Sequence, residues 1–103
     1  MSIVFHILKE EYDRLIQAEN IYKKAIAAEV RGSPKVKQIG NNEYLYLQRR
    51  IGKRVVQEYI GCLHSKKAAS VLDSIDKRKK NEESLKKVLN DMNEIKKVLR
   101  GKI

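Results

Sequence analysis

The sequence predicts an α+β fold in a single domain, residues 1–103: an N-terminal helix, a three-stranded antiparallel β-meander, and a long C-terminal helix or helix pair with coiled-coil character. Two observations support this prediction. Apolar residues recur at helical spacing in the first and last thirds of the chain, whereas they alternate with polar residues in the middle third. The chain also has five Gly and one Pro, and all but one of them lie between residues 31 and 64.

The first segment, residues 1–30, is expected to contain an amphipathic helix over residues 8–29. No Gly or Pro interrupts this stretch, and its apolar residues recur with a period close to that of a helix. These residues are Leu8, Tyr12, Leu15, Ile16, Ile21, Tyr22, Ala25 and Ile26. The helix is expected to end before Gly32, which would supply a C-cap, and Pro34, which prevents the helix from resuming.

The middle segment, residues 35–63, is expected to form the β-meander. Residues 44–47 and 55–60 are its clearest runs of strand-forming residues. Turn signals at residues 40–42 and 51–53 separate the strands. The three expected strands are residues 35–39, 43–50 and 54–61.

The two faces of this sheet are expected to differ, because alternate side chains of a strand point to opposite sides. One face should be buried, and its residues are Leu45, Leu47, Val56 and Ile60. The other should be polar, aromatic and cationic, with Tyr44, Tyr46, Gln48, Arg50, Gln57 and Tyr59.

The last segment, residues 65–100, is expected to be a basic helix with Ser65 as its N-cap. An apolar seam with spacings of three and four residues runs along its C-terminal part and consists of Leu85, Val88, Met92, Ile95 and Leu99. The seam is broken across residues 76–84, so either one long helix bends there or two helices meet. An exposed seam needs cover from the first helix, a second copy or another protein. We expect a homo-oligomer with these five residues at its interface.

The chain is strongly basic, with 23 Lys and Arg against 13 Asp and Glu, and a formal net charge of +10. Such a charge attracts polyanions. Residues 31–64 carry seven Lys and Arg but two Asp and Glu, so the sheet is the expected partner surface. The candidate nucleic-acid-binding residues are Lys35, Lys37, Tyr44, Tyr46, Gln48, Arg49, Arg50, Lys53, Arg54 and Gln57.

A β-hairpin fits into the major groove of DNA, where side chains on one face reach the base edges. Gln48 and Gln57 carry the amide that reads adenine, and Arg50 carries the fork that reads guanine. Tyrosines would instead stack on the unpaired bases of a single strand or of RNA. We favour DNA over RNA. The alternative interpretation is that cations at strand edges only keep them soluble.

A second basic run, residues 76–80, lies on the expected C-terminal helix. Charge runs on helices usually form a solvated face, and contact with backbone phosphates is the functional alternative.

The middle segment also resembles a known pattern. It resembles the pattern G-S…K…Y-x-Y-L-x-x-R…G-K-x-V…Y-[IL]-G. The residues that carry the resemblance are Gly32-Ser33, Lys37, Tyr44-Leu45-Tyr46-Leu47, Arg49, Gly52-Lys53, Val55 and Tyr59-Ile60-Gly61. This pattern is similar to that of small uncharacterised prokaryotic proteins and of the β-rich N-terminal region of some transposases and integrase-like proteins. The resemblance implies a sheet that serves DNA binding, and a place near mobile elements or toxin–antitoxin systems. It carries over no catalytic residue.

No motif in the sequence predicts an enzyme, a cofactor or a metal site. His6 and His64 are far apart, and a Gly-rich phosphate loop and a nucleophile elbow are both missing. Cys62 is expected to be a buried, inert thiol in a reducing cytoplasm. The apolar start of the chain is too short for a signal peptide, and no stretch approaches the roughly 20 apolar residues of a membrane span.

We therefore expect a non-enzymatic cytoplasmic protein, namely a nucleic-acid-binding accessory or regulatory protein that recognises its partner through the basic β-hairpin face. The alternative is a protein-interaction module, such as an antitoxin-like or assembly subunit, which docks through its helices and uses its charge only for solubility. A third hypothesis is peripheral binding to acidic membranes.

Overall fold

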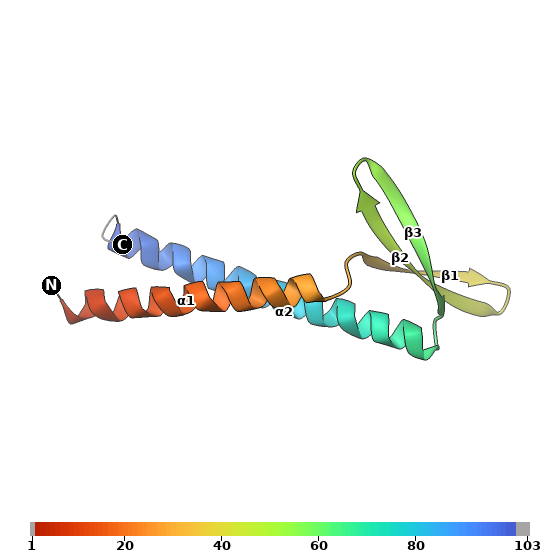
Figure 1. The fold of residues 1–103 in the computed structure, drawn as a ribbon, viewed down its shortest axis with the longest axis horizontal. Coiled ribbons are helices and arrows are strands. Elements are labelled where there is room, and N and C mark those ends of the chain that lie inside the picture. The colour runs from red at the N-terminus through yellow and green to blue at the C-terminus, as the bar shows by residue number, and fades with distance from the viewer. Residues whose placement is uncertain (1, 101–103) are drawn as a thin grey trace. The chain divides into compact units, whose positions relative to one another are not determined.

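The computed structural model describes residues 2–100 and confirms the α+β fold (Figure 1). Its elements, in chain order, are α1 (Ile3–Ala28), β1 (Ser33–Ile39), β2 (Asn42–Ile51), β3 (Arg54–Cys62) and α2 (Lys66–Leu99). The chain divides into two compact units. Unit 1 comprises α1 and the part of α2 that begins at Lys79, and unit 2 comprises residues 29–78.

Helix α1 begins earlier than the apolar pattern predicts, at Ile3 instead of Leu8. The reason is a cap at its first turn, where the backbone N–H of Phe5 donates a hydrogen bond of 3.2 Å to Ser2 Oγ. A serine hydroxyl in this position satisfies one of the amide groups that a helix start leaves without a partner.

In unit 1, α1 packs against the C-terminal part of α2. The buried residues of this core are Leu15 of α1 and Val88, Met92, Ile95 and Leu99 of α2. Four of the five seam residues are therefore covered within the chain, and Leu85 is half-buried. Within the chain, α1 supplies the apolar surface that the seam requires, and the expected interface between copies stays a prediction.

Helix α2 is one continuous helix of 34 residues, which resolves the choice between one helix and two. Ser65 caps it as predicted, since its Oγ accepts a hydrogen bond of 3.2 Å from the N–H of Ala68. The break in the seam marks a change of packing partner along this helix. Before the break, Val71, Leu72 and Ile75 pack in the core of unit 2, and after it the seam packs in the core of unit 1.

The three strands form one antiparallel sheet in the order β1-β2-β3. Both hairpins have two-residue turns that begin with a glycine of positive φ, +65° at Gly40 and +63° at Gly52. Glycine at the first central position is the requirement of a type II′ turn, which matches the twist of antiparallel strands. The predicted strands are thus confirmed, with ends one or two residues longer.

The core of unit 2 lies between the sheet and the N-terminal part of α2. It contains Leu45, Leu47 and Ile60 of the sheet, with Ala68 and Ile75 of α2. The pairing of β2 with β3 shifts between Leu45 and Tyr46. This irregularity leaves Ile60 as an extra residue of β3 whose side chain is buried.

Val56 is not buried, contrary to the prediction, and its side chain is 42% exposed. The register pairs Val56 with Arg49, so it does lie on the same side of the sheet as Leu47. It lies, however, nearer the β2–β3 turn and outside the buried cluster to which α2 contributes. Alternation along a strand shows on which side of the sheet a residue lies, but it does not show how far the covering helix extends over that side.

Gly32 is not the C-cap of α1, since the helix ends at Ala28. Its φ is +117°, and a Cβ built on it would lie 2.8 Å from the carbonyl oxygen of Gln48 and 2.9 Å from Leu47 Cγ. Gly32 is therefore required where the chain passes close to β2 just before β1 begins.

We expect Gly32→Ala to lower the free energy of unfolding by roughly 2 to 3 kcal/mol, because the methyl group adds a steric overlap to an unfavourable φ. The matched control is Gly40→Ala, where φ is +65° but no atom lies within 4 Å. It should cost only about 1 kcal/mol. Urea denaturation of both variants measures the difference, and equal losses would show that the close approach to β2 is unimportant.

Candidate functional site

The candidate site is the sheet surface opposite the core of unit 2, here called the outer face. Residues directly opposite each other on antiparallel strands project to the same side. The register pairs Tyr46 with Lys35 on β1 and with Tyr59 on β3. The outer face therefore brings together seven predicted residues and Tyr59; the seven are Lys35, Lys37, Tyr44, Tyr46, Gln48, Arg50 and Gln57.

Three tyrosines form an aromatic cluster on the outer face. The ring of Tyr59 lies 5.4 Å from that of Tyr46 in an edge-to-face arrangement and 6.1 Å from that of Tyr44. The Nζ of Lys37 lies 4.4 Å from the centroid of the Tyr46 ring, a cation–π contact. These contacts hold the rings in place while Tyr59 remains 54% exposed.

Desolvation raises the pKa of the Tyr59 hydroxyl, and Cys62, Tyr44 and Tyr46 raise it further through their charges. A tyrosine hydroxyl is protonated at neutral pH and can donate a hydrogen bond, and the raised pKa extends that state to higher pH. Cys62 pairs with Tyr44 on the same face and is exposed, which corrects the prediction of a buried thiol. Its position on an edge strand, away from the core, is the reason.

Two glutamines lie next to the tyrosine cluster and contact each other. Gln57 Nε2 donates a hydrogen bond of 3.1 Å to Gln48 Oε1 across the β2–β3 ladder. The bond orients both amides, and it does not use the Gln48 amino group or the Gln57 oxygen. An amide with a donor and an acceptor available can bind a base edge.

The other three predicted residues, Arg49, Lys53 and Arg54, do not lie on the outer face. Lys53 is in the β2–β3 turn, and Arg49 and Arg54 belong to the opposite side of the ladder. Arg49 forms an ion pair of 2.7 Å with Glu58, which reduces the charge that it can offer a ligand. All three are exposed, and they lie in the part of the β2–β3 hairpin that includes its turn.

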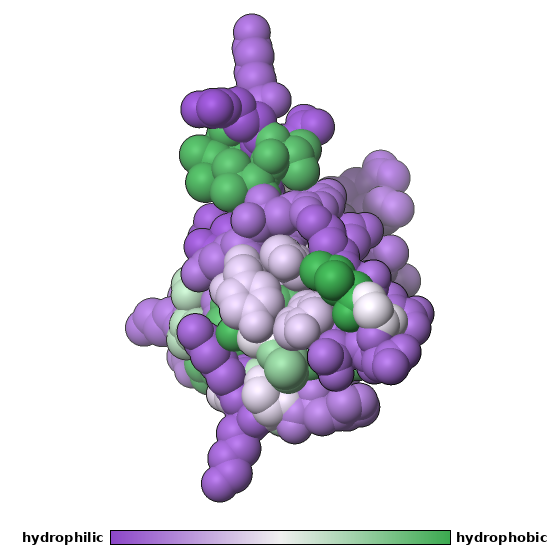
Figure 2. Space-filling model, turned by 90° about the vertical axis from the view of Figure 1, so that its right-hand side faces the viewer, coloured by the Kyte–Doolittle hydropathy of each residue, from purple (hydrophilic) through white to green (hydrophobic). Residues whose placement is uncertain are grey.

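Apolar side chains gather towards the tip of the β2–β3 hairpin, at the top of Figure 2, with hydrophilic side chains at its end. The exposed apolar residues of this region are Ile51, Val55 and Val56. A surface of this composition can contact both apolar and anionic groups of a partner.

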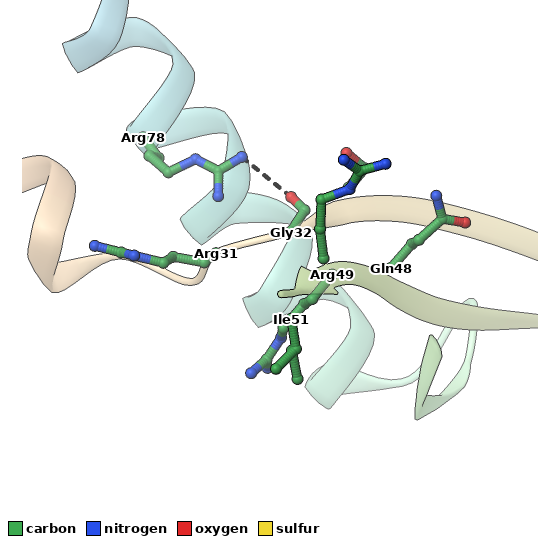
Figure 3. Close-up of a pocket in the computed structure, with 8 residues that line it drawn as sticks. Arg31, Gly32, Gln48, Arg49, Ile51 and Arg78 are labelled. Carbon is green, nitrogen blue, oxygen red and sulfur yellow. Dashed lines mark hydrogen bonds between the residues drawn. The ribbon is translucent and has the colours of Figure 1, made fainter. Parts of the chain in front are cut away.

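An open pocket of about 480 Å³ lies beside the end of β2 and is lined by four arginines (Figure 3). Arg31 comes from the linker between α1 and β1, Arg49 and Arg50 come from β2, and Arg78 comes from α2. We call it the arginine pocket. Gln48 also lines it, so the pocket adjoins the outer face.

Sequence reasoning did not assign Arg31 and Arg78 to the site. Arg78 belongs to the basic run at residues 76–80, for which a solvated face was the main interpretation. In the structure it is half-buried, and it donates hydrogen bonds of 2.8 Å to the carbonyl of Val30 and 3.1 Å to that of Gly32. A charge run alone carries no signal for such a contact between distant segments.

No group of three or more His, Cys, Asp or Glu side chains in residues 2–100 is placed to hold a metal ion. Neither of the two helices in this range combines the length and apolar character needed to cross a membrane.

Comparison with known proteins gives one family. Residues 7–68 match the family model described as a domain of unknown function, DUF6788, which covers more than half of the chain. No curated protein and no solved structure shows a significant match. The matched range includes most of α1, the whole sheet and the start of α2.

Proposed function

We propose that this chain, which belongs to the DUF6788 family, is a nucleic-acid-binding protein that uses the outer face of its sheet. The observation that carries the proposal is the composition of that face. Lysines, three tyrosines in contact and a pair of oriented glutamines lie together on one antiparallel ladder. Cations bind phosphates, while amides and guanidinium groups read base edges.

Duplex DNA is the partner that fits this face best. Gln48, Gln57 and Arg50 project from one side of a hairpin, and a two-stranded ribbon fits into the major groove of B-form DNA. The major groove of A-form RNA is too narrow for such an element. We further propose an accessory or regulatory role in the cytoplasm, where the exposed Cys62 thiol would stay reduced.

The test is a binding titration against duplex DNA, single-stranded DNA and structured RNA over a range of salt concentrations. We expect the tightest binding to duplex DNA, with log K falling linearly against log salt by about 0.9 per phosphate contact. Binding to none of the three at low salt would contradict the proposal.

Replacing Lys53 and Arg54 together by Ala should weaken binding to all sequences alike and reduce the salt slope by about 2. The matched control is the double replacement of Lys9 and Lys24 by Ala. Both residues are exposed on α1, and replacing them removes the same amount of charge. It should leave the slope unchanged. If both doubles reduce the slope equally, the binding reflects net charge and not the hairpin tip.

Replacing Gln48 or Gln57 by Ala should instead reduce discrimination between DNA sequences, by roughly 1 to 3 kcal/mol for each lost base contact. The measurement is competition between a selected binding sequence and random duplex. Because these side chains are proposed to read bases, an equal loss for both duplexes would contradict that role.

A second candidate function is a protein-interaction module that associates through its helices, with itself or with another protein. The observation that favours it is the number of exposed apolar side chains on the helices of unit 1. They are Ile3, Val4, Ile7 and Ile21 of α1 and Leu89 and Val98 of α2. Light scattering at increasing protein concentration tests self-association, and a monomer throughout would count against a homo-oligomer.

A further inference from the structure

The arginine pocket has the composition of an anion site. None of its lining residues is acidic, and four of them are arginines. Guanidinium groups bind phosphate oxygens through two parallel hydrogen bonds, which gives them both affinity and geometric preference for phosphate.

The backbone that carries Arg31 is held in place by α2. Arg78 donates to the carbonyls on both sides of Arg31, at Val30 and at Gly32, and Figure 3 shows the bond to Gly32. The N–H of Val30 in turn donates to Ser74 Oγ at 2.8 Å, and that hydroxyl contacts Glu29 at 2.5 Å. Arg78 is therefore a positioning residue that fixes the linker at the rim of the pocket.

Two of the four arginines have their charge available to a ligand. Arg49 is engaged with Glu58, and Arg78 is engaged with backbone carbonyls. Among the ion pairs found in residues 2–100, none includes Arg31 or Arg50, and both side chains are exposed. In Figure 3 the Arg31 side chain points away from Arg49, so it must rotate towards a bound ligand.

The end of β2 adds a backbone donor at the same place. Pairing with β1 stops at Gln48, which lies opposite Ser33, so Arg50 has no residue of β1 opposite it. The carbonyl oxygen of Gln48 faces β1, since it would lie 2.8 Å from a Cβ on Gly32. Groups two residues apart on a strand face the same edge, so the N–H of Arg50 also points to the open edge.

We propose that the arginine pocket binds a phosphate group through Arg31 and Arg50. Gln48 and Arg50 belong to both the pocket and the outer face. The sugar-phosphate backbone of a nucleic acid that lies along the outer face therefore reaches the pocket past the end of β1. A phosphodiester of bound nucleic acid is thus the source that rests on the proposed function. A free phosphate or pyrophosphate is the other source of the same chemistry.

The test compares four proteins: the wild type, the pocket double variant Arg31→Ala with Arg50→Ala, the corresponding double Lys variant, and the control double variant Lys9→Ala with Lys24→Ala. Lys9 and Lys24 are exposed on α1 and do not line the pocket, and their replacement removes the same charge as the pocket double variant. Each is titrated with pyrophosphate by calorimetry and with duplex DNA over a range of salt. Circular dichroism checks that every variant is folded. The double Lys variant, Arg31→Lys with Arg50→Lys, keeps the positive charge but lacks the guanidinium group that forms two parallel hydrogen bonds.

We expect the pocket double variant Arg31→Ala with Arg50→Ala to bind pyrophosphate about tenfold or more weakly, with the Lys9 and Lys24 control within about twofold of the wild type. The double Lys variant should fall in between. A reduction of the DNA salt slope by about 2 would identify a phosphodiester as the source. Two other outcomes would support the pocket and assign it to free phosphate. In both, the variant loses pyrophosphate binding; in one its DNA binding is the same as that of the wild type, and in the other neither protein binds DNA.

The proposal is overturned if the wild type does not bind pyrophosphate, or if the Lys9 and Lys24 control binds it as weakly as the pocket double variant does. DNA binding that survives in either case would leave the outer face as the interface without the pocket. Failure of the pocket and failure of the proposed function are therefore separate results.

Discussion

Leu47→Ala is expected to lower the free energy of unfolding by about 2 to 5 kcal/mol, as large-to-small substitutions in packed cores do. Leu47 lies on the central strand, is 1% exposed and packs in the cluster shared by the sheet and α2. The loss includes the transfer free energy of the removed carbons and the cavity that they leave. Denaturation in urea, monitored by circular dichroism, measures it.

The controls for this prediction come from the same strands. Val56→Ala should cost much less, because the Val56 side chain is 42% exposed, and Tyr46→Ala removes a ring from the outer face and not from the core. Ile60→Ala should resemble Leu47→Ala, since Ile60 is buried in the same cluster. Similar losses at all four positions would show that the two faces of the sheet are assigned wrongly.

The sides of the sheet were predictable because a strand has a period of two residues and the turns were marked by glycines. The pairs Tyr46–Tyr59 and Gln48–Gln57 follow from that register. Burial was less predictable, because it depends on the reach of α2 over the sheet. Val56, near the hairpin tip, is exposed for this reason, whereas Cys62 is exposed because it lies on the outer face, which is opposite the core.

The candidate site divides in the same way. The outer face is a local property of two hairpins, so alternation was enough to assemble it. The arginine pocket depends on a contact between Arg78 and Val30, which are 48 residues apart in the sequence. Nothing local marks such a pair, and the run at residues 76–80 looked like an ordinary solvated helix face.

The seam of α2 shows why apolar periodicity predicts burial but not the partner. The spacing of Val88, Met92 and Ile95 requires an apolar surface alongside, and α1 and a second copy satisfy that requirement equally well. The structure places α1 there. The break in the seam was a sign of two packing partners along one continuous helix and not of a second helix.

Ile95→Ala is accordingly expected to lower the free energy of unfolding by about 2 to 5 kcal/mol, the usual range for a buried isoleucine. Ile95 is 9% exposed in the core of unit 1, where α1 contributes Leu15. Hydrogen exchange should show the loss of protection in α1 and in the part of α2 that belongs to unit 1. Val98→Ala is the control, because Val98 is on the same turn but exposed.

The dependence on protein concentration separates the two possible partners of the seam. If α1 covers it, unfolding of wild type and of Ile95→Ala is unimolecular, and both melting temperatures stay constant over a hundredfold range of concentration, roughly 1 to 100 μM. If the seam lay between copies, the melting temperature would rise with concentration, and Ile95→Ala would steepen the rise by weakening the association. A constant melting temperature together with a large loss of stability therefore identifies the seam as an intrachain core, and a rising one returns it to an interface between copies.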